Sequence, residues 1–202
     1  MAESSLLSAL HDIRDRGRSW FADDPRATVK LVVAVTLLGL VLRVAALGSR
    51  GAHFDEGRVA YWALHLRDSG SFAYRYIIHG PFIQHVDSWM FTVAAPTDFT
   101  MRLPVAIVGG LLPLTALLFR KHLRSDETVL MAVFLALNPV LLYFSRFMRS
   151  DVLVAAFMFA AFGLLVRFVD TRKARYLYGV GAFMALGFAS KENAIVYVLT
   201  WL

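Results

Sequence analysis

Long apolar stretches recur along this chain, separated by short polar turns and by one longer segment of mixed character. A hydrocarbon layer about 30 Å thick requires roughly 17 to 25 apolar residues in each spanning helix, so these stretches predict membrane-spanning helices. The pattern therefore indicates an all-α, polytopic transmembrane helical bundle. The predicted helices cover residues 31–47, 103–119, 128–145, 152–169, 177–189 and 194–202.

The two ends of the chain lead to different expectations. Residues 1–30 mix acids and bases, and Leu6, Leu10 and Ile13 suit one face of an amphipathic helix in an N-terminal tail. The last apolar stretch is still running at Leu202, and a spanning helix that ended there would leave carbonyl groups unpaired in hydrocarbon. We therefore expect the natural protein to continue, with 194–202 a truncated helix.

Alternation of the predicted helices assigns each polar segment to one side of the membrane. Residues 48–102 share a side with the turns at 146–151 and 190–193. The tail and the turns at 120–127 and 170–176 lie on the other side and are rich in lysine and arginine, which indicates the cytoplasm. The sequence thus predicts a multi-pass cell-membrane protein with a cytoplasmic N-terminus.

The predicted external loop, 48–102, is expected to fold onto the membrane surface. Residues 56–66 place apolar side chains on one face of a short juxtamembrane helix. Gly80-Pro81 then opens a second short helix that runs to about Val93, because proline is favoured in the first turn of a helix.

Composition narrows the classes of partner. The 202 residues are 58% hydrophobic and 18% charged, with a formal charge of +6, and the basic residues stand in small groups between apolar stretches. Membrane lipids with anionic headgroups are therefore expected partners, and nucleic acid is not. The chain has no cysteine, which excludes disulfides and thiolate metal sites.

Two adjacent carboxylates, Asp55 and Glu56, follow the first predicted helix. Paired acids repel each other, so one of them is a candidate base for a hydroxyl acceptor, or a ligand for a divalent cation. The alternative is structural: Asp55 caps the next helix and Arg58 neutralises Glu56. The residues alone leave both interpretations open.

Two further groups are predicted on the same side. His79 stands in a rigid turn beside a predicted helix start, where anions bind readily, although a structural hydrogen bond to a carbonyl is the alternative. Lys191 offers a positive charge to a phosphate, with Glu192 beside it. An internal Lys191–Glu192 salt bridge is the alternative for that turn.

A charged turn at the outer boundary contains Arg146, Arg149 and Asp151. An arginine near hydrocarbon costs roughly 2.5 to 3.5 kcal/mol unless it finds a partner or reaches water. A lipid phosphate or the Asp55–Glu56 pair is a suitable partner, and extension to the headgroups is the alternative. Arg43, inside the first predicted helix, is expected to reach the headgroups or to pair with an acid.

All these groups fall on one predicted membrane face, and together they suit one chemistry. Cations stabilise a departing phosphate, and a carboxylate accepts the proton of an attacking hydroxyl. The combination favours the transfer of a sugar from a phospholipid carrier.

The motifs resemble those of the GT-C superfamily of membrane glycosyltransferases, especially the protein O-mannosyltransferase and aminoarabinose transferase branch. The resemblance covers about residues 30–202, the N-terminal half of such a protein. The matching residues are Phe54-Asp55-Glu56, His79-Gly80-Pro81-Phe82, Arg102-Leu103-Pro104, Ser145-Arg146 with Asp151, and Ser190-Lys191. A narrower resemblance, to an archaeal family associated with the flipping of lipid-linked oligosaccharides during protein glycosylation, is carried by His53-Phe54-Asp55-Glu56-Gly57-Arg58, His79-Gly80-Pro81 and Ser145-Arg146-Phe147.

The resemblance implies a polyprenyl-phosphate sugar donor, an external active site and an inverting transfer to an unidentified acceptor. It implies that Asp55 acts as base or positions the acceptor, and that Arg146, Arg149 and Lys191 lie near the carrier phosphate. The family commonly has Pro-Pro where this chain has Gly80-Pro81, and no strict Asp-x-Asp surrounds Asp151. We therefore predict no metal and no cofactor, although carboxylates of this kind are able to hold a divalent cation.

Two other functions are compatible with the residues. A non-catalytic protein would bind the lipid-linked sugar and assist its flipping without breaking a glycosidic bond. A transporter would carry ionisable residues in the middle of several helices, whereas here they gather at the helix ends.

Overall fold

A computed structural model of the chain describes residues 26–75 and 78–201. The predicted amphipathic helix of the tail lies outside the described residues. Within them the chain is all-α, as predicted. The helices are α2 (Ala27–Val44), α3 (Phe54–Ser69), α4 (Pro81–Val93), α5 (Leu103–Leu111), the 3₁₀ helix η1 (Leu112–Phe119), α6 (Ser125–Leu137), α7 (Pro139–Phe144), α8 (Ser150–Thr171), α9 (Ala174–Ser190) and α10 (Ala194–Thr200).

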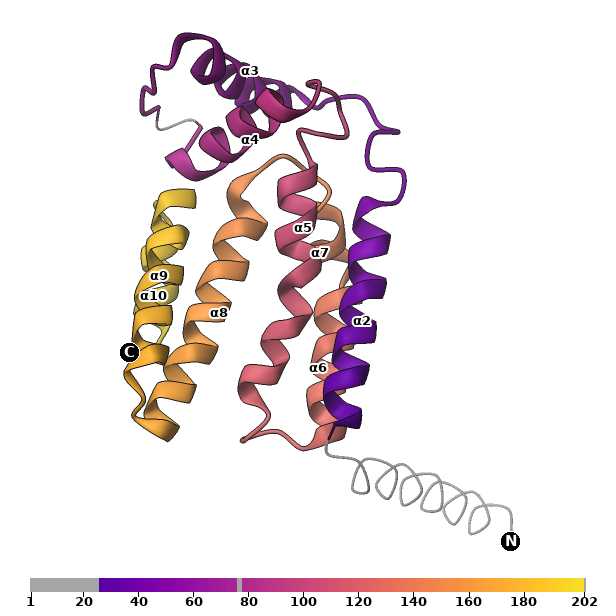
Figure 1. Cartoon of the computed structure of the whole chain (residues 1–202), viewed down its shortest axis with the longest axis vertical. Helices are drawn as coiled ribbons and strands as arrows, with labels where there is room; N and C mark the ends of the chain where they lie inside the picture. Colours follow the sequence, from indigo (N-terminus) through magenta and orange to yellow (C-terminus); the bar gives the residue numbers. More distant parts are fainter. Residues whose placement is uncertain (1–25, 76–77, 202) are drawn as a thin grey trace, which may run out of the picture.

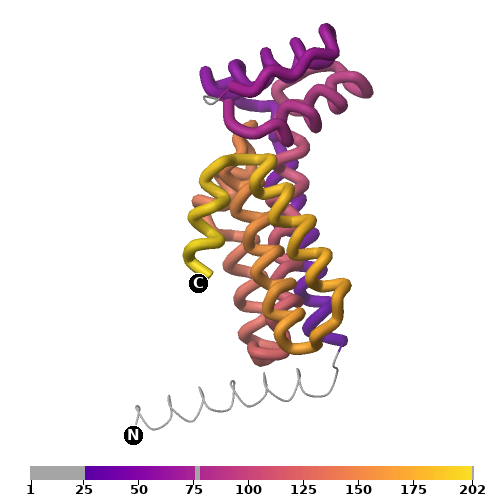
Figure 2. Tube along the Cα trace, turned by 90° about the vertical axis from the view of Figure 1, so that its left-hand side faces the viewer, coloured from indigo at the N-terminus to yellow at the C-terminus, as the bar shows by residue number. Residues whose placement is uncertain are grey.

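The helices form an upright bundle with a layer across one end (Figures 1 and 2). The bundle contains α2, α5, η1, α6, α8 and α9, and the layer consists of α3 and α4, which pack against each other. A buried apolar cluster joins the two parts, with Val59 from α3, Ile83 from α4, and Val152 and Phe157 from α8. The α3–α4 layer is thereby fixed over the ends of α8 and α9.

The structure corrects two of the predicted helices. The stretch 103–119 changes from α-helix to 3₁₀ helix at Leu112, next to Pro113, and the stretch 128–145 is divided into α6 and α7 at Asn138-Pro139. Proline has no amide hydrogen and clashes with the preceding turn, so it interrupts an α-helix in both places. The helices α8, α9 and α10 lie within about three residues of their predicted bounds, whereas α2, at Ala27–Val44, lies three to four residues earlier than the predicted 31–47. The helix α4 begins at Pro81 and ends at Val93 as expected.

Arg43 occupies the break between α6 and α7. Its side chain is fully buried, and it donates from Nη1 to the carbonyl of Ala136 at 2.9 Å and from Nη2 to that of Leu135 at 3.2 Å. An α-helix would pair the Leu135 carbonyl with the amide of residue 139, which is proline. Arg43 therefore replaces the missing donor. Its side chain is buried in the protein and does not extend to the headgroups, and no acidic side chain of residues 26–75 and 78–201 pairs with it.

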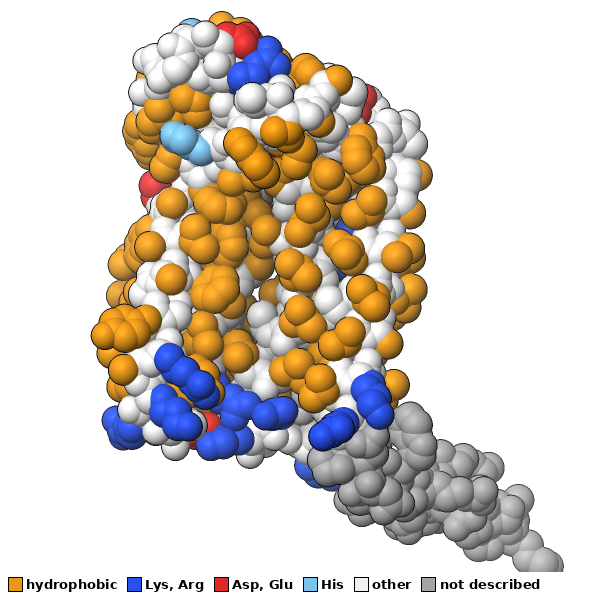
Figure 3. Space-filling model, in the orientation of Figure 1, with side chains coloured by type: hydrophobic (Ala, Val, Ile, Leu, Met, Phe, Trp, Pro, Cys, Tyr) orange, Lys and Arg blue, Asp and Glu red, His pale blue; other side chains and the backbone are white. Residues whose placement is uncertain are grey.

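Two helices of the described chain, α2 and α8, are long and apolar enough to cross a membrane by length and composition. The segment Leu103–Phe119 is apolar but shorter. The outward faces of α2 and α6 are apolar, with Leu37, Val41, Leu130 and Phe134 exposed, and one side of the bundle is largely apolar between its charged ends (Figure 3). Such a surface suits lipid.

Candidate functional site

The two adjacent acids begin α3 and point in different directions. His53 is the N-cap residue: its side chain accepts a hydrogen bond from the amide of Asp55, and Glu56 accepts one from the amide of His53. This reciprocal capping satisfies amides at the start of the helix. The negative charge in the first turn lies at the positive end of the helix dipole, which is a favourable interaction. Glu56 is fully buried, whereas Asp55 remains partly exposed.

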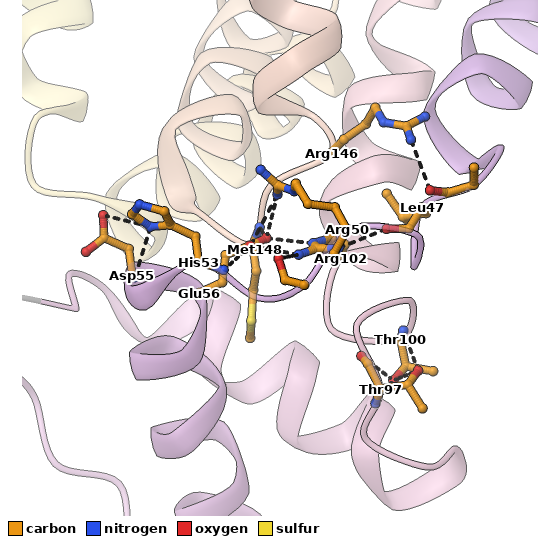
Figure 4. A network of polar contacts seen from close by, with 12 residues as sticks. Leu47, Arg50, His53, Asp55, Glu56, Thr97, Thr100, Arg102, Arg146 and Met148 are labelled. Carbon is orange, nitrogen blue, oxygen red and sulfur yellow. Dashed lines mark hydrogen bonds and ion pairs between the residues drawn. The ribbon is translucent and has the colours of Figure 1, made fainter.

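Glu56 is the centre of a buried polar network (Figure 4). Arg102 donates to both of its oxygens, from Nε at 2.7 Å and from Nη2 at 2.8 Å, and the amide of Met148 donates at 3.0 Å. Nη2 of Arg50 lies 3.2 Å from Oε2 of Glu56. Burial raises the pKa of Glu56, but the hydrogen bonds from Arg102, His53 and Met148 outweigh it, and the pKa lies below its ordinary value. This carboxylate is therefore held ionised and fully engaged.

Arg102 carries the same network into the loop that precedes α3. Its Nη1 donates to the carbonyls of Leu47 at 3.0 Å and Arg50 at 2.7 Å, and its Nη2 donates to that of Gly51 at 3.1 Å. Together with Glu56 it ties the α3–α4 layer to the start of α5 and to the 146–151 turn. The sequence indicates Arg102 only as part of the Arg102-Leu103-Pro104 motif and does not indicate this buried role.

A second set of contacts, which we call the ion-pair chain, starts at Asp55. Arg58 lies 2.8 Å from its Oδ1, and Arg149 lies 2.9 Å from its Oδ2. Arg149 also contacts Asp151 at 3.1 Å, and Lys191 contacts Asp151 at 2.6 Å. The ion-pair chain thus links three segments that the predicted topology places on one side. Arg58 pairs with Asp55 and not with Glu56.

His79 is held by the turn that joins the α3–α4 layer to α9. It adopts a left-handed conformation with φ of 66°, and the amide of Gly80 donates to the carbonyl of Ser190 at 3.3 Å. A Cβ at Gly80 would lie 2.1 Å from the carbonyl oxygen of Ala189, so only glycine permits this approach. The turn presents His79 Nδ1 to Glu192 at 3.2 Å.

Glu192 faces His79 and not its neighbour Lys191. It accepts a hydrogen bond from the hydroxyl of Tyr74 as well as the contact from His79. Burial raises the pKa of Glu192, but the hydrogen bonds from Tyr74, its own backbone amide and His79 outweigh it, and the pKa is lowered. The internal Lys191–Glu192 salt bridge is therefore absent from the structure, and Tyr74 is a site residue that the sequence analysis missed.

A small cavity brings three of the predicted site residues together. It measures about 40 Å³ and is lined by Asp55, His79 and Arg149, with Arg58 beside them. Arg146 lies elsewhere: it donates to the carbonyls of Leu42, Ala45 and Ala46 at 2.6, 2.8 and 3.2 Å and so caps the C-terminal end of α2. In Figure 4 it is turned toward that end of α2.

Metal ligands do not converge in the described part of the chain. No group of three or more histidine, aspartate or glutamate side chains there is placed to hold a metal ion. The absence of a metal from the reaction stays a prediction.

The fold and the site define a helical membrane protein that gathers acids and bases at one end of its bundle. The family model of the dolichyl-phosphate-mannose-protein mannosyltransferases matches residues 78–202, which is more than half of the chain. The chain therefore belongs to this family of membrane glycosyltransferases, and the predicted GT-C resemblance is confirmed. Neither the search of curated proteins nor that of solved structures gave a match.

The matched range divides the candidate site. It includes His79, Arg149, Asp151, Lys191 and Glu192, but it begins after the two acids of α3. Those acids join the matched part through contacts: Asp55 through Arg149, and Glu56 through Arg102 and Met148. The narrower resemblance to the archaeal set stays a prediction.

Proposed function

We propose that this protein transfers a sugar from a polyprenyl phosphate, such as dolichyl phosphate, to a hydroxyl acceptor with inversion at the sugar carbon. The family membership supports the reaction class. The single observation that carries the site is the ion-pair chain, which brings Asp55, Arg149, Asp151 and Lys191 into one connected group.

Asp55 is the proposed base. Its carboxylate takes the proton of the acceptor hydroxyl, whose oxygen attacks the sugar carbon on the side opposite the phosphate. The bond between that carbon and the phosphate oxygen breaks, and the polyprenyl phosphate leaves. Arg149 and Lys191 are proposed to contact the phosphate, where their charges stabilise the negative charge that develops.

The other predicted residues take supporting roles in this proposal. Asp151 holds Arg149 and Lys191 at one site, and Glu192 holds His79 against the cavity. Glu56 fixes the position of its neighbour Asp55, because its own oxygens are occupied by Arg102 and by backbone amides. Arg146 supports the end of α2 and is not among the proposed phosphate contacts.

The charge of the ion-pair chain supports a phosphodiester donor. Three cations, Arg58, Arg149 and Lys191, face two carboxylates, Asp55 and Asp151, which leaves one positive charge in excess. A lipid-linked sugar phosphate carries one negative charge, so its binding neutralises the group. The cavity of about 40 Å³ has room for a few water molecules but not for a sugar phosphate, so the donor must displace existing ion pairs.

The proposal places the reaction on the external side of a multi-pass membrane protein. The α3–α4 layer and the ion-pair chain lie at one end of the bundle, and lysine and arginine residues gather at the other (Figure 3). By the positive-inside tendency the end rich in lysine and arginine, where α2 begins, faces the cytoplasm, and we propose a cytoplasmic N-terminus. Arg149 and Lys191 supply the positive charge, so we propose that no divalent cation is needed.

The transfer is tested with a radiolabelled dolichyl-phosphate sugar and the purified protein in lipid nanodiscs. We expect Asp55→Asn to reduce release of dolichyl phosphate by at least about 100-fold, the scale of a lost general base. Asp68→Asn is the matched control, because Asp68 is an exposed acid of the same helix and its one ion pair among the described residues is with Arg67. Equal release by Asp55→Asn and wild type would remove Asp55 from the reaction.

A second function, binding of the lipid-linked sugar to assist its flipping, is favoured by one observation. Both oxygens of Asp55 are engaged by arginines, Oδ1 by Arg58 and Oδ2 by Arg149, so an acceptor hydroxyl must share an oxygen with an arginine or displace one. The same experiment separates the two functions. Bound donor that is never cleaved, whatever acceptor is supplied, supports flipping and contradicts the transferase.

A further inference from the structure

The end of the bundle opposite the α3–α4 layer carries cations that lack acidic partners. Figure 3 shows lysine and arginine side chains gathered along this edge, which we call the basic end. Within the described residues Arg120, Lys121, Arg172 and Lys173 form no side-chain hydrogen bond or ion pair, whereas Arg124 pairs with the acids of its own helix start. Each cation of the ion-pair chain at the opposite end already has a carboxylate.

Part of this charge surrounds a cavity. The cavity measures about 420 Å³ and lies between the first turns of α2 and α6, the 120–124 turn and the last turns of α8. Arg120, Lys121 and Arg167 contribute to its lining, together with Ser125 and Thr128 from the start of α6. With Thr28 of α2, three cations and three hydroxyl side chains thus line one space, in which no acidic side chain takes part among the described lining residues.

Arg167 is the most constrained of these cations. It is only 8% exposed, and among the described residues its guanidinium makes a single hydrogen bond, from Nη2 to the carbonyl of Leu117 at 3.4 Å. An arginine has five donor hydrogens, and a buried charge with so few partners is costly. Because Arg167 lines the cavity, the oxygens of an anionic ligand bound there would accept its remaining donors.

An apolar path leads from the cavity along the bundle. Val29 lines the cavity, and Val33 and Leu37 follow at four-residue intervals on the same face of α2. They are 40% and 58% exposed, so this face is open to the surroundings. The cavity therefore combines a site for an anionic headgroup with a surface for an acyl chain.

We infer that this cavity binds the headgroup of an anionic phospholipid from the leaflet at the basic end. Its phosphate contacts Arg120, Lys121 and Arg167, and an acyl chain runs along Val33 and Leu37. Basic pockets between membrane helices suit lipid phosphates, and the excess of positive charge disfavours zwitterionic lipids. This site is separate from the proposed donor site, which lies at the other end of the bundle.

Native mass spectrometry tests the inference with the purified protein in neutral detergent, titrated with phosphatidylglycerol and with phosphatidylcholine. We expect Arg120→Gln/Lys121→Gln to weaken phosphatidylglycerol binding about fivefold for each cation removed, about 25-fold in all, with phosphatidylcholine unaffected. Arg172→Gln/Lys173→Gln is the matched control, because it removes the same charge from the same end outside the cavity. Arg167→Lys, which keeps the charge but loses the planar fork, should also weaken binding.

The outcomes are distinct. Equal losses of phosphatidylglycerol affinity in Arg120→Gln/Lys121→Gln (the cavity pair) and in Arg172→Gln/Lys173→Gln (the control pair) would indicate diffuse attraction to the basic end. That result would overturn the site. Displacement of the lipid by inorganic phosphate at comparable concentration would assign the cavity to a soluble anion and would overturn the lipid. Heat unfolding gives a second measurement: phosphatidylglycerol should raise the Tm of the wild type and of the control pair, but not that of the cavity pair.

Discussion

Replacement of Arg102 by methionine removes the main partner of a fully buried carboxylate. In the native protein Arg102 contacts both oxygens of Glu56 and three backbone carbonyls, while Arg50, which is 43% exposed, supplies only a longer contact. Removal of one partner from a buried ion pair costs about 3 to 5 kcal/mol, because the charge of Glu56 stays buried with less compensation, from Arg50 and two backbone amides. For a chain of this size each kcal/mol lowers Tm by about 2 to 4 °C, so the expected fall is about 6 to 20 °C.

The assay is heat unfolding of the protein in detergent, followed by circular dichroism. Arg67→Met is the control, because Arg67 on the same layer pairs with the exposed Asp68 and donates one hydrogen bond, at 3.2 Å, to the carbonyl of Phe91, and each of these contacts contributes about 1 kcal/mol. The double variant Arg102→Met/Glu56→Met should recover most of the loss, since no unpaired charge remains buried. A double variant less stable than the single one, or a single variant with unchanged Tm, would refute the assigned role of this pair.

Three other substitutions are predicted from the same structure. Asp87 is fully buried with neither carboxylate oxygen hydrogen-bonded among the described residues, and burial raises its pKa well above the ordinary value. The folded protein therefore holds a proton that the unfolded chain releases above about pH 4, so the Tm advantage of Asp87→Asn over wild type should grow from pH 4 to pH 7. A constant difference would contradict this. Gly80→Ala should cost about 1 to 3 kcal/mol in urea unfolding, because its Cβ would meet a backbone carbonyl, and an unchanged midpoint would argue against that approach. Arg43→Leu should lower stability by about 1 to 3 kcal/mol by leaving carbonyls of α6 unpaired, and equal Tm values would show that another group pairs them.

The sequence predicted the helices better than the contacts between them. Apolar stretches and the Gly80-Pro81 start were sufficient to place α4, α8 and α9 within a few residues, because these signals are local. Pro139 is also a local signal, for a helix break, but the apolar stretch 128–145 led to the prediction of one continuous helix.

The polar contacts depend on side-chain direction, which the sequence does not give. Arg146 and Arg149 are three residues apart, yet Arg146 follows α7 and turns to the carbonyls of α2, whereas Arg149 precedes α8 and turns to Asp55. Similarly, Lys191 and Glu192 are adjacent and bind different partners, since the 190–193 turn directs their side chains to α8 and to His79. The alternation of the predicted helices was sufficient to assign these residues to one side of the membrane. Which of them contact each other depends on the packing of the helices.

The central claim is that Arg149 and Lys191 bind the phosphate of the lipid carrier at the end of the bundle covered by α3 and α4. Its most direct test is the Kd of dolichyl phosphate for purified wild type, Arg149→Met, Lys191→Met and the control Arg67→Met. A charge-assisted hydrogen bond contributes about 1.5 to 3 kcal/mol, so each of the first two substitutions should raise the Kd by at least about tenfold, with the control unchanged. Wild-type affinity in both Arg149→Met and Lys191→Met would contradict the account.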